Sequence, residues 1–390
     1  MSEGIGPLVK EVERIYNSER NQKTLRCWQG IADFRGKFRG YPTDRRELGG
    51  KIPFIADLMP PLWAKIFGYN VREYYTDPET FLEYYLKQQI YQFEELQDDT
   101  PVLKAVPIYM GTGFESGLYG AVTLYSDTTD PWVAREPVLK EPEDLARLEP
   151  ADFYRTGQMP LVHEFYRTLT GLLPDDWQVI FPELGRGPFG VAVHLRGYDT
   201  LLMDLILNPK FAQDLLGFLV EDRIRWTKER AKFLGTNEAL GNLNNDEVCC
   251  PMLSPALYEE MILPHEIKIA AFHGGAGYWH SCGNITELLP LIKRIPGLKM
   301  VQVSPQTDLS TACRVFAGAS LELDVNPVRD ILDTSEEGMA AKLQEYKDGL
   351  VQNGHTKAYI RAGSLAPLAT ADQDLAKIKT WIRVAREILG

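Results

Sequence analysis

Short apolar runs alternate with longer amphipathic segments through most of this 390-residue chain. From about residue 160 the alternation is regular, because each run of β-forming residues precedes a segment with helical spacing of its apolar positions. Such alternation indicates a parallel sheet, since each helix carries the chain back to the edge where the next strand begins. Strands are predicted at residues 103–109, 178–184, 239–245, 278–282, 298–303, 320–324 and 357–362, with an eighth at 53–58.

Eight strand–helix units in one chain predict an α/β fold of the (β/α)8 TIM-barrel class. Residues 1–100 are expected to form an N-terminal helical extension packed on the barrel, and residues 101–390 the barrel itself. Residues 114–160 are rich in Gly, Asp and Pro, so a long inserted excursion is expected there. Chemistry in TIM barrels lies at the C-terminal ends of the strands, and the residues at those ends are therefore the candidates for a site.

Charge and cysteine usage narrow the class of protein. The net charge of −12 argues against nucleic acid or an anionic membrane as the main partner. The chain contains no run of 18 apolar residues, so no transmembrane helix is expected. The N-terminus shows no signal-peptide pattern. Five cysteines without framework spacing indicate a reducing compartment, so we expect a cytoplasmic protein whose cysteines are free or bound to metal.

His280 and Cys282 stand two residues apart at the end of a predicted strand. Side chains alternate faces along a strand, so the imidazole and the thiol are expected to point the same way. Two such ligands followed by a turn make half of a zinc site. A buried histidine beside an inert core cysteine would give the same pattern, so the motif by itself leaves both interpretations open.

Other predicted strand ends also carry polar or metal-binding side chains. Asp246 and Glu247 are candidate catalytic acids, and Cys249 and Cys250 follow them in the same loop. Residues at the other ends are candidates for substrate binding: Glu183, Asn245, Gln302, Asp324 and Ser364. The strand ends of any TIM barrel carry a few polar residues. A thiol, an imidazole and carboxylates from separate strands on one rim are less expected.

Several motifs resemble the uroporphyrinogen decarboxylase superfamily: Gly187-Pro188-Phe189 before a helix, Leu195-Arg196-Gly197, Leu253-Ser254-Pro255, Leu263-Pro264 and His280-x-Cys282-Gly283-Asn284. Within that superfamily, His-x-Cys-Gly is similar to the cobamide-dependent methyltransferase branch. These enzymes move methyl groups between a corrinoid protein and an acceptor. The resemblance covers roughly residues 100–390 and implies a (β/α)8 fold, in agreement with the strand count.

The resemblance implies that His280 and Cys282 bind zinc. The family's third ligand is a cysteine that follows a glycine near the C-terminus, and the matching residue here is Ser364. A neutral hydroxyl is a poor zinc ligand, which leaves three possibilities open. A thiolate of Cys249 or Cys250 replaces the lost one, a carboxylate of Asp246 or Glu247 does so, or the site has lost its metal.

The function expected from this resemblance is methyl transfer between a corrinoid and a thiol or folate acceptor. Bound zinc would lower the pKa of the acceptor thiol, and the thiolate would attack the methyl group of the corrinoid. A folate nitrogen would instead be activated by the metal or by an acid such as Asp246 or Glu247, and Arg196 is a further catalytic candidate. No Asp-x-His-x-x-Gly corrinoid signature occurs, so the corrinoid is expected on a partner protein. A homodimer is also expected.

Two other functions remain open at this point. One is a metal-independent decarboxylation of a small acidic or tetrapyrrole substrate, since fold does not determine function. The Arg-Gln-Ala-Gly-Arg motif that binds substrate carboxylates in that branch is absent, although the basic segment 35–46 remains. The other is a non-catalytic member with a decayed site, which Ser364 favours.

Overall fold

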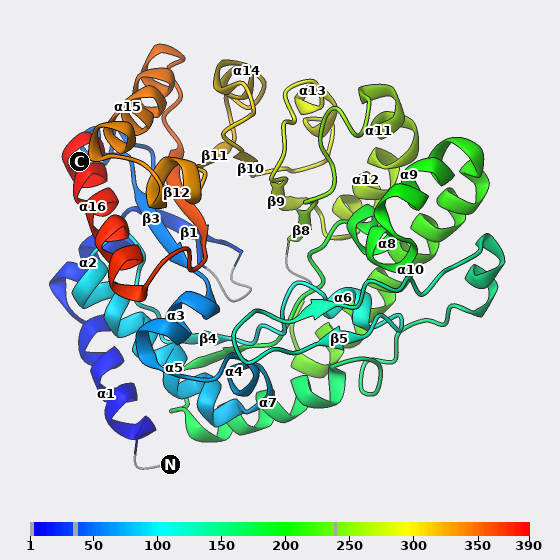
Figure 1. Cartoon of the computed structure of the whole chain (residues 1–390), viewed down its shortest axis with the longest axis horizontal. Helices are drawn as coiled ribbons and strands as arrows, with labels where there is room; N and C mark the ends of the chain where they lie inside the picture. Colours follow the sequence, from blue (N-terminus) through cyan, green and yellow to red (C-terminus); the bar gives the residue numbers. More distant parts are fainter. Residues whose placement is uncertain (1–3, 34–37, 238–239) are drawn as a thin grey trace.

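The computed structural model describes residues 4–33, 38–237 and 240–390. Its centre is a parallel sheet with the strand order β3-β12-β11-β10-β9-β8. These strands are β3 (Phe54–Leu58), β8 (Gly241–Asn244), β9 (Ala276–His280), β10 (Met300–Val303), β11 (Ser320–Asp324) and β12 (Ala358–Leu365). A second parallel pair is formed by β4 (Ala105–Pro107) and β7 (Gln178–Ile180). Helices surround both groups of strands in a ring (Figure 1).

Each of the eight predicted strands is present, although residue 239 of one of them lies outside the described residues. The closed barrel is observed only in part. Within the described residues, no strand pairing joins β3 to β4 or β7 to β8, and only an isolated bridge between Arg186 and Asn244 spans the second gap. β4 and β7 are each three residues long, and Pro107 cannot donate a ladder hydrogen bond, so these strands offer little edge for closure.

A β-hairpin fills one end of the ring. β1 (Trp28–Asp33) and β2 (Arg39–Pro42) pair antiparallel. Tyr41 Oη donates a hydrogen bond to the carbonyl of Gly277 near the start of β9 (3.0 Å), and the Trp28 ring packs edge-on against Tyr359 near the start of β12 (5.1 Å between centroids). The hairpin therefore lies among the inward-facing side chains at the N-terminal ends of the strands, opposite the rim where a site is expected.

The N-terminal segment contains the helices α1 (Ile5–Tyr16), α2 (Glu19–Leu25), α3 (Pro60–Phe67), α4 (Val71–Thr76) and α5 (Pro78–Tyr91), followed by a π-helical turn at Gln92–Leu96. The hairpin and β3 lie in this same segment, so the sheet begins within the residues assigned from the sequence to a helical extension. β3 matches the strand predicted at 53–58, whereas the hairpin of β1 and β2 was not predicted from the sequence.

The later helices follow the strands and cover the outside of the sheet (Figure 1). They are α7 (Met159–Leu172), α8 (Pro188–Arg196), α9 (Tyr198–Leu207), α10 (Pro209–Leu234), α11 (Pro255–Met261), α12 (Leu263–Phe272), α13 (Leu289–Ile292), α14 (Leu309–Val315), α15 (Glu336–Gln352) and α16 (Ala371–Leu389). Side-chain caps mark several starts, since Ser254 accepts from Leu257 N and Thr370 forms a capping box with Gln373.

Residues 114–160 form the excursion, with α6 (Phe114–Gly117), the antiparallel pair β5 (Thr123–Leu124) and β6 (Trp132–Val133), and a 3-10 turn at Pro142–Arg147.

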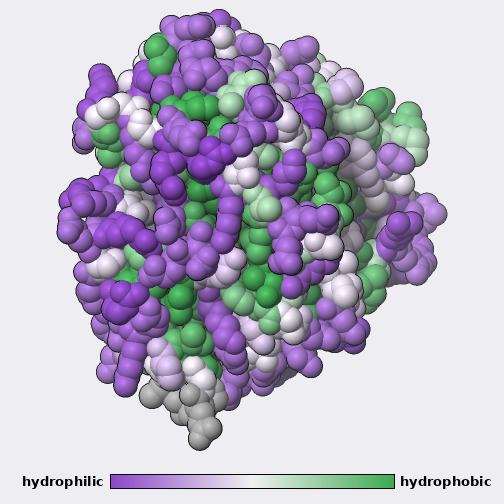
Figure 2. All heavy atoms as spheres, turned by 60° about the vertical axis from the view of Figure 1, so that its left-hand side comes forward, coloured by the Kyte–Doolittle hydropathy of each residue, from purple (hydrophilic) through white to green (hydrophobic). Residues whose placement is uncertain are grey.

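Figure 2 shows a largely hydrophilic face on the side of α1, α2 and α16, with hydrophobic side chains visible in narrow strips. Among the described residues, no helix is both long and apolar enough to span a membrane.

Candidate functional site

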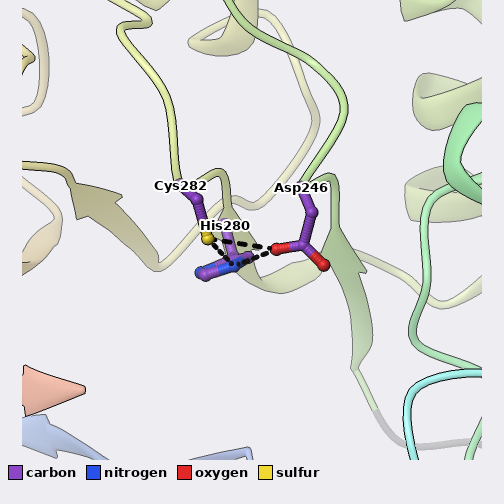
Figure 3. A group of neighbouring side chains, drawn as sticks. All are labelled: Asp246, His280 and Cys282. Atoms are coloured by element: carbon purple, nitrogen blue, oxygen red, sulfur yellow. Dashed lines mark hydrogen bonds and ion pairs between the residues drawn. The ribbon is translucent and has the colours of Figure 1, made fainter. Parts of the chain in front are cut away.

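Three possible metal ligands meet where β8 and β9 end (Figure 3). Asp246 Oδ1 lies 2.6 Å from His280 Nε2 and 3.3 Å from Cys282 Sγ. His280 Nε2 and Cys282 Sγ are 3.4 Å apart. The parallel register pairs Asn244 with His280, so Asp246 follows β8 at the level where Cys282 follows β9. Each side chain comes from the C-terminal end of a strand, as expected for a TIM-barrel site.

The turn after Cys282 depends on a residue without a side chain. A Cβ atom on Gly283 would lie 2.3 Å from Cβ of Cys249, so the loop after β8 approaches the loop after β9 too closely for any larger residue. Ser281 Oγ donates to the Val248 carbonyl (2.8 Å) and joins the same two loops. This contact holds the Asp246 loop against the His280–Cys282 turn, and the three possible ligands keep their spacing.

A buried arginine connects Asp246 to a wider network. Arg186 Nη1 lies 3.3 Å from Asp246 Oδ2, and Nη2 pairs with Glu247. The backbone nitrogen of Arg186 donates to Glu115 Oε1 (2.7 Å). His194 Nδ1 is 2.8 Å from Ser116 Oγ, and its Nε2 is 3.8 Å from Glu247. Arg186 thereby leaves Oδ1 of Asp246 directed toward His280 and Cys282.

The pKa values of the site reflect burial and neighbouring charge. Burial raises the pKa of Asp246, but His280 and Arg186 outweigh it and hold that pKa well below its ordinary range. Desolvation and then the negative charge of Asp246 raise the pKa of the Cys282 thiol far above its ordinary value, although this side chain is exposed to the pocket. Desolvation lowers the pKa of His194 to about 3, so its ring is neutral at neutral pH.

A cavity of about 210 Å³ opens in front of the three ligands. Of the candidates from the sequence, its lining includes Glu183, Asp246, His280, Cys282, Asp324 and Ser364. Burial raises the pKa of Asp324 to about 6, although Arg361 opposes the shift. Asp324 accepts hydrogen bonds from Gln302 Nε2 (2.9 Å) and from the Gly363 nitrogen (3.1 Å).

A second charged network forms the floor of this cavity. Glu322, fully buried, accepts from Tyr278 Oη (2.7 Å) and from Tyr359 Oη, and it pairs with Arg361 Nη1 at 3.3 Å. Arg39, from the hairpin, reaches Glu322 with its Nε at 3.4 Å. Burial raises the pKa of Glu322, but the two guanidinium groups outweigh it and lower that pKa overall.

The remaining candidates from the sequence lie outside the cavity lining. Asn245 and Gln302 are fully buried behind it. Cys250 Sγ donates to the Leu253 carbonyl (3.4 Å), and Cys249 packs on Gly283. Glu247 pairs with Arg186, as described above.

Arg196 also lies away from the three ligands. Its Nε donates to Asp204 (2.7 Å), and its Nη1 donates to the carbonyls of Leu139 and Lys140. These contacts tie helix α8 to the chain at the end of the excursion.

Sequence reasoning did not assign Arg186, Glu115, Glu322 or Arg39 to the site. Arg186 stands beside the Gly187-Pro188-Phe189 motif, and its position at a strand end was a usable signal. Glu115 and Arg39 come from the excursion and the hairpin, whose placement against the sheet no local pattern reveals. Glu322 lies within β11, where a charged residue in an apolar run signals a buried ion pair.

Comparisons with known proteins agree with this fold. The family model described as uroporphyrinogen decarboxylase (URO-D) matches residues 63–388. A methylated-thiol–coenzyme M methyltransferase of Methanosarcina mazei is 26% identical over 162 residues, which cover 40% of this chain and 41% of that relative. The match thus spans about two fifths of the relative's length. The solved structure of a methyltransferase from Methanosarcina mazei has a TM-score of 0.64 at 17% identity, and the match covers 87% of this chain and 95% of that one.

Proposed function

This chain belongs to the uroporphyrinogen decarboxylase (URO-D) family, and from that premise we propose that it is a zinc-assisted methyltransferase. It would move a methyl group between a corrinoid, carried by a partner protein, and a thiol or folate acceptor. The family match confirms the superfamily that the Gly-Pro-Phe and His-x-Cys-Gly motifs indicated. Two matched relatives are named as methyltransferases, which supports this activity over decarboxylation.

The observation that carries the proposal is the cluster of Asp246, His280 and Cys282, whose ligand atoms all lie within 4.8 Å of one another. A tetrahedral zinc ion with ordinary bond lengths separates sulfur from nitrogen or oxygen by about 3.5 Å. The two distances from Cys282 Sγ, 3.3 and 3.4 Å, are close to that value, and the Asp246–His280 contact is shorter at 2.6 Å. One carboxylate and one thiolate also balance the charge of a divalent ion.

In this proposal Asp246 takes the place of the cysteine that the family has where this chain has Ser364. A carboxylate oxygen is an accepted zinc ligand and carries the same charge as a thiolate. Arg186 binds the other oxygen of Asp246 and so orients it, as outer partners of metal ligands commonly do. Three protein ligands leave a fourth position open, which is the arrangement of catalytic rather than structural zinc.

Zinc bound there would supply Lewis-acid chemistry, by lowering the pKa of an acceptor thiol so that its thiolate exists at neutral pH. The chain's own residues have separate tasks. Asp324, which lines the same cavity and has a pKa of about 6, is suited to hold a proton from the acceptor at a carboxylate oxygen.

The size of the cavity supports a corrinoid on a separate protein. A space of about 210 Å³ holds a small molecule, whereas a corrinoid ring is several times larger. The ring would therefore lie over the rim formed by the strand ends. The excursion of residues 114–160 borders this cavity through Phe114 and Glu115, and in this proposal it forms part of the docking surface.

Metal analysis tests the proposal most directly. We expect about one zinc per chain in protein purified without chelator, and loss of both zinc and methyl transfer from a methyl-corrinoid protein in Cys282→Ala. Cys313→Ala is the matched control, because Cys313 is buried in α14 and should keep the metal. A wild-type protein without metal, or a Cys282→Ala variant with full activity, would contradict the zinc mechanism.

A further inference from the structure

A second cavity, of about 110 Å³, lies beside the site, at the seam where β3 and β4 do not pair. Residues of β3, α3, α4 and α5 line it on one side, and Pro107 and Tyr109 on the other. Tyr109 also lines the metal-site cavity, and the ion pair between Asp57 and Arg361 stands between the two, with Asp57 in one lining and Arg361 in the other. The two cavities are therefore neighbours.

Six aromatic residues belong to the lining of this second cavity: Phe38, Trp63, Tyr74, Phe81, Tyr85 and Tyr109. Several are held rigidly by one another, since the Tyr74 and Phe81 centroids are 5.0 Å apart and those of Phe81 and Tyr85 are 5.8 Å apart. No Lys, Arg or His belongs to the described lining, whereas the carboxylate of Asp57 does. Rings around a cavity without a resident cation form the environment that attracts a methylated cation through cation–π interactions.

The volume and polarity argue against an accidental packing void. Voids larger than a water molecule are few in a domain, and a dry engineered cavity of about 150 Å³ is enough to bind benzene. This cavity is somewhat smaller, at about 110 Å³, and suits a group of about five heavy atoms. Gln89 Nε2 is buried without a hydrogen-bond acceptor among the described residues; an onium group has no acceptor to offer it, so that acceptor would have to come from another part of the bound molecule.

The charged residues that line the neighbouring metal-site cavity also disfavour an anionic substrate. Its lining holds five carboxylates: Asp33, Glu115, Glu183, Asp246 and Asp324. Three arginines also line it, and each is already paired with acidic groups: Arg39 with Asp33 and Glu322, Arg186 with Asp246 and Glu247, and Arg361 with Asp57 and Glu322. The three arginines that line this cavity are thus all engaged by acidic partners, which disfavours the binding of an anionic substrate there.

We infer that the aromatic cavity binds the methylated onium group, a quaternary ammonium or tertiary sulfonium, of the small molecule that serves the neighbouring site. The inference rests on the proposed function, because it names the substrate class of that methyltransferase. Trp63 provides the largest ring, and Tyr109 lines both cavities. Asp57 lies at the boundary between them, where it pairs with Arg361.

Binding of a probe to the full chain tests the inference. Tetramethylammonium is the probe, with tert-butyl alcohol as a neutral molecule of the same shape and methanesulfonate as an anion of similar size. Ligand-observed NMR at constant ionic strength gives each Kd. We expect tetramethylammonium to bind at least about tenfold more tightly than tert-butyl alcohol, because the free energy of a desolvated cation–π contact corresponds to at least that ratio of Kd values. Methanesulfonate should show no saturable binding.

Variants locate the probe. Trp63→Leu and Tyr109→Leu should each reduce the preference for the cation to less than about threefold, because each removes a ring face. Trp63→Phe keeps a ring and should retain most of it, as should Trp132→Leu, whose side chain is exposed on β6. Circular dichroism confirms folding, and the two Leu variants test the cavity independently of each other.

Two results would overturn the inference: equal affinity for tert-butyl alcohol, or a cation preference that survives both Leu variants. The measurement needs neither metal nor corrinoid protein. A chain that binds zinc and transfers methyl groups without the cation preference would refute this inference alone. A chain with the cation preference but no zinc would refute the zinc mechanism alone.

Discussion

The carboxylate of Asp246 lies 2.6 Å from the imidazole of His280, although the two residues are 34 positions apart in the chain. Parallel pairing of β8 with β9 produces this contact, because it sets Asn244 beside His280. The same register brings Cys282 Sγ within 3.3 Å of Asp246. A nitrogen, an oxygen and a sulfur ligand thus converge without any local sequence motif that contains all three.

Asp246 and Ser364 provide a test of the proposed third zinc ligand. Asp246→Ala should lower zinc affinity by at least about 100-fold, because it removes a direct ligand and such losses exceed those from outer-shell changes. Adding Ser364→Cys to that variant should restore much of the affinity, since Ser364 lines the same cavity and a thiolate is a strong zinc ligand. Competition with a zinc chelator measures both. If the double variant binds no better than Asp246→Ala, residue 364 does not reach the metal.

Asp324 should make stability depend on pH. Its folded pKa of about 6 lies above the ordinary value of 3.8, so the folded state holds the proton more tightly than the unfolded state. Stability from this group is present below about pH 4 and is lost as the pH rises to about 6, a total of at most about 3 kcal/mol. Asp324→Asn should therefore gain stability relative to the wild type across that window and keep the gain at pH 7. Urea unfolding at pH 4 to 7.5 measures it, and a constant difference would contradict the shift.

Removing only one partner of the Glu322–Arg361 ion pair should lower the unfolding free energy strongly. Arg361→Met leaves the carboxylate of Glu322 buried with less compensation, and we expect a loss of about 3–5 kcal/mol in unfolding free energy. Glu322→Gln added to that variant should recover a substantial part, because the uncompensated charge is then gone. Double-mutant analysis by denaturant unfolding gives the coupling. Additive losses would mean that other groups, such as Arg39, already satisfy Glu322.

A substitution of Arg196 distinguishes a catalytic role of this residue from a structural one. Its guanidinium joins Asp204 and two carbonyls at the end of the excursion, so Arg196→Met should lower the melting temperature and leave the zinc content unchanged. Methyl transfer per folded molecule should also stay close to that of the wild type. A variant with normal stability but little activity would support the catalytic role expected from the sequence.

Much of the fold was predictable because short strands and amphipathic helices leave periodic patterns along the chain. β8 to β12 appear where apolar runs predicted them, and β3 corresponds to the eighth run at 53–58. Closure of the barrel was not predictable in the same way. It depends on whether the edges of β4 and β7 extend far enough to pair with β3 and β8, which a count of strands does not reveal.

The choice among the possible third ligands shows a similar limit. Asp246, Glu247, Cys249 and Cys250 lie within five residues in one loop, and all four are chemically suitable. Their directions depend on the backbone of that loop, which contacts Gly283, Asn284 and Arg186. These contacts turn Asp246 toward His280, Glu247 toward Arg186, and Cys250 toward its own loop.

By itself, the sequence determined the positions of eight strands and the pair His280–Cys282 at a strand end, because periodicity and spacing are local properties. The tertiary structure decided which acidic group lies beside that pair, which arginine pairs with that group, and that an aromatic cavity lies nearby. Those features arise from pairings between segments up to about 300 residues apart, such as Asp57 with Arg361. Long-range contacts of this kind depend on register and on packing against the sheet, and no local pattern encodes either.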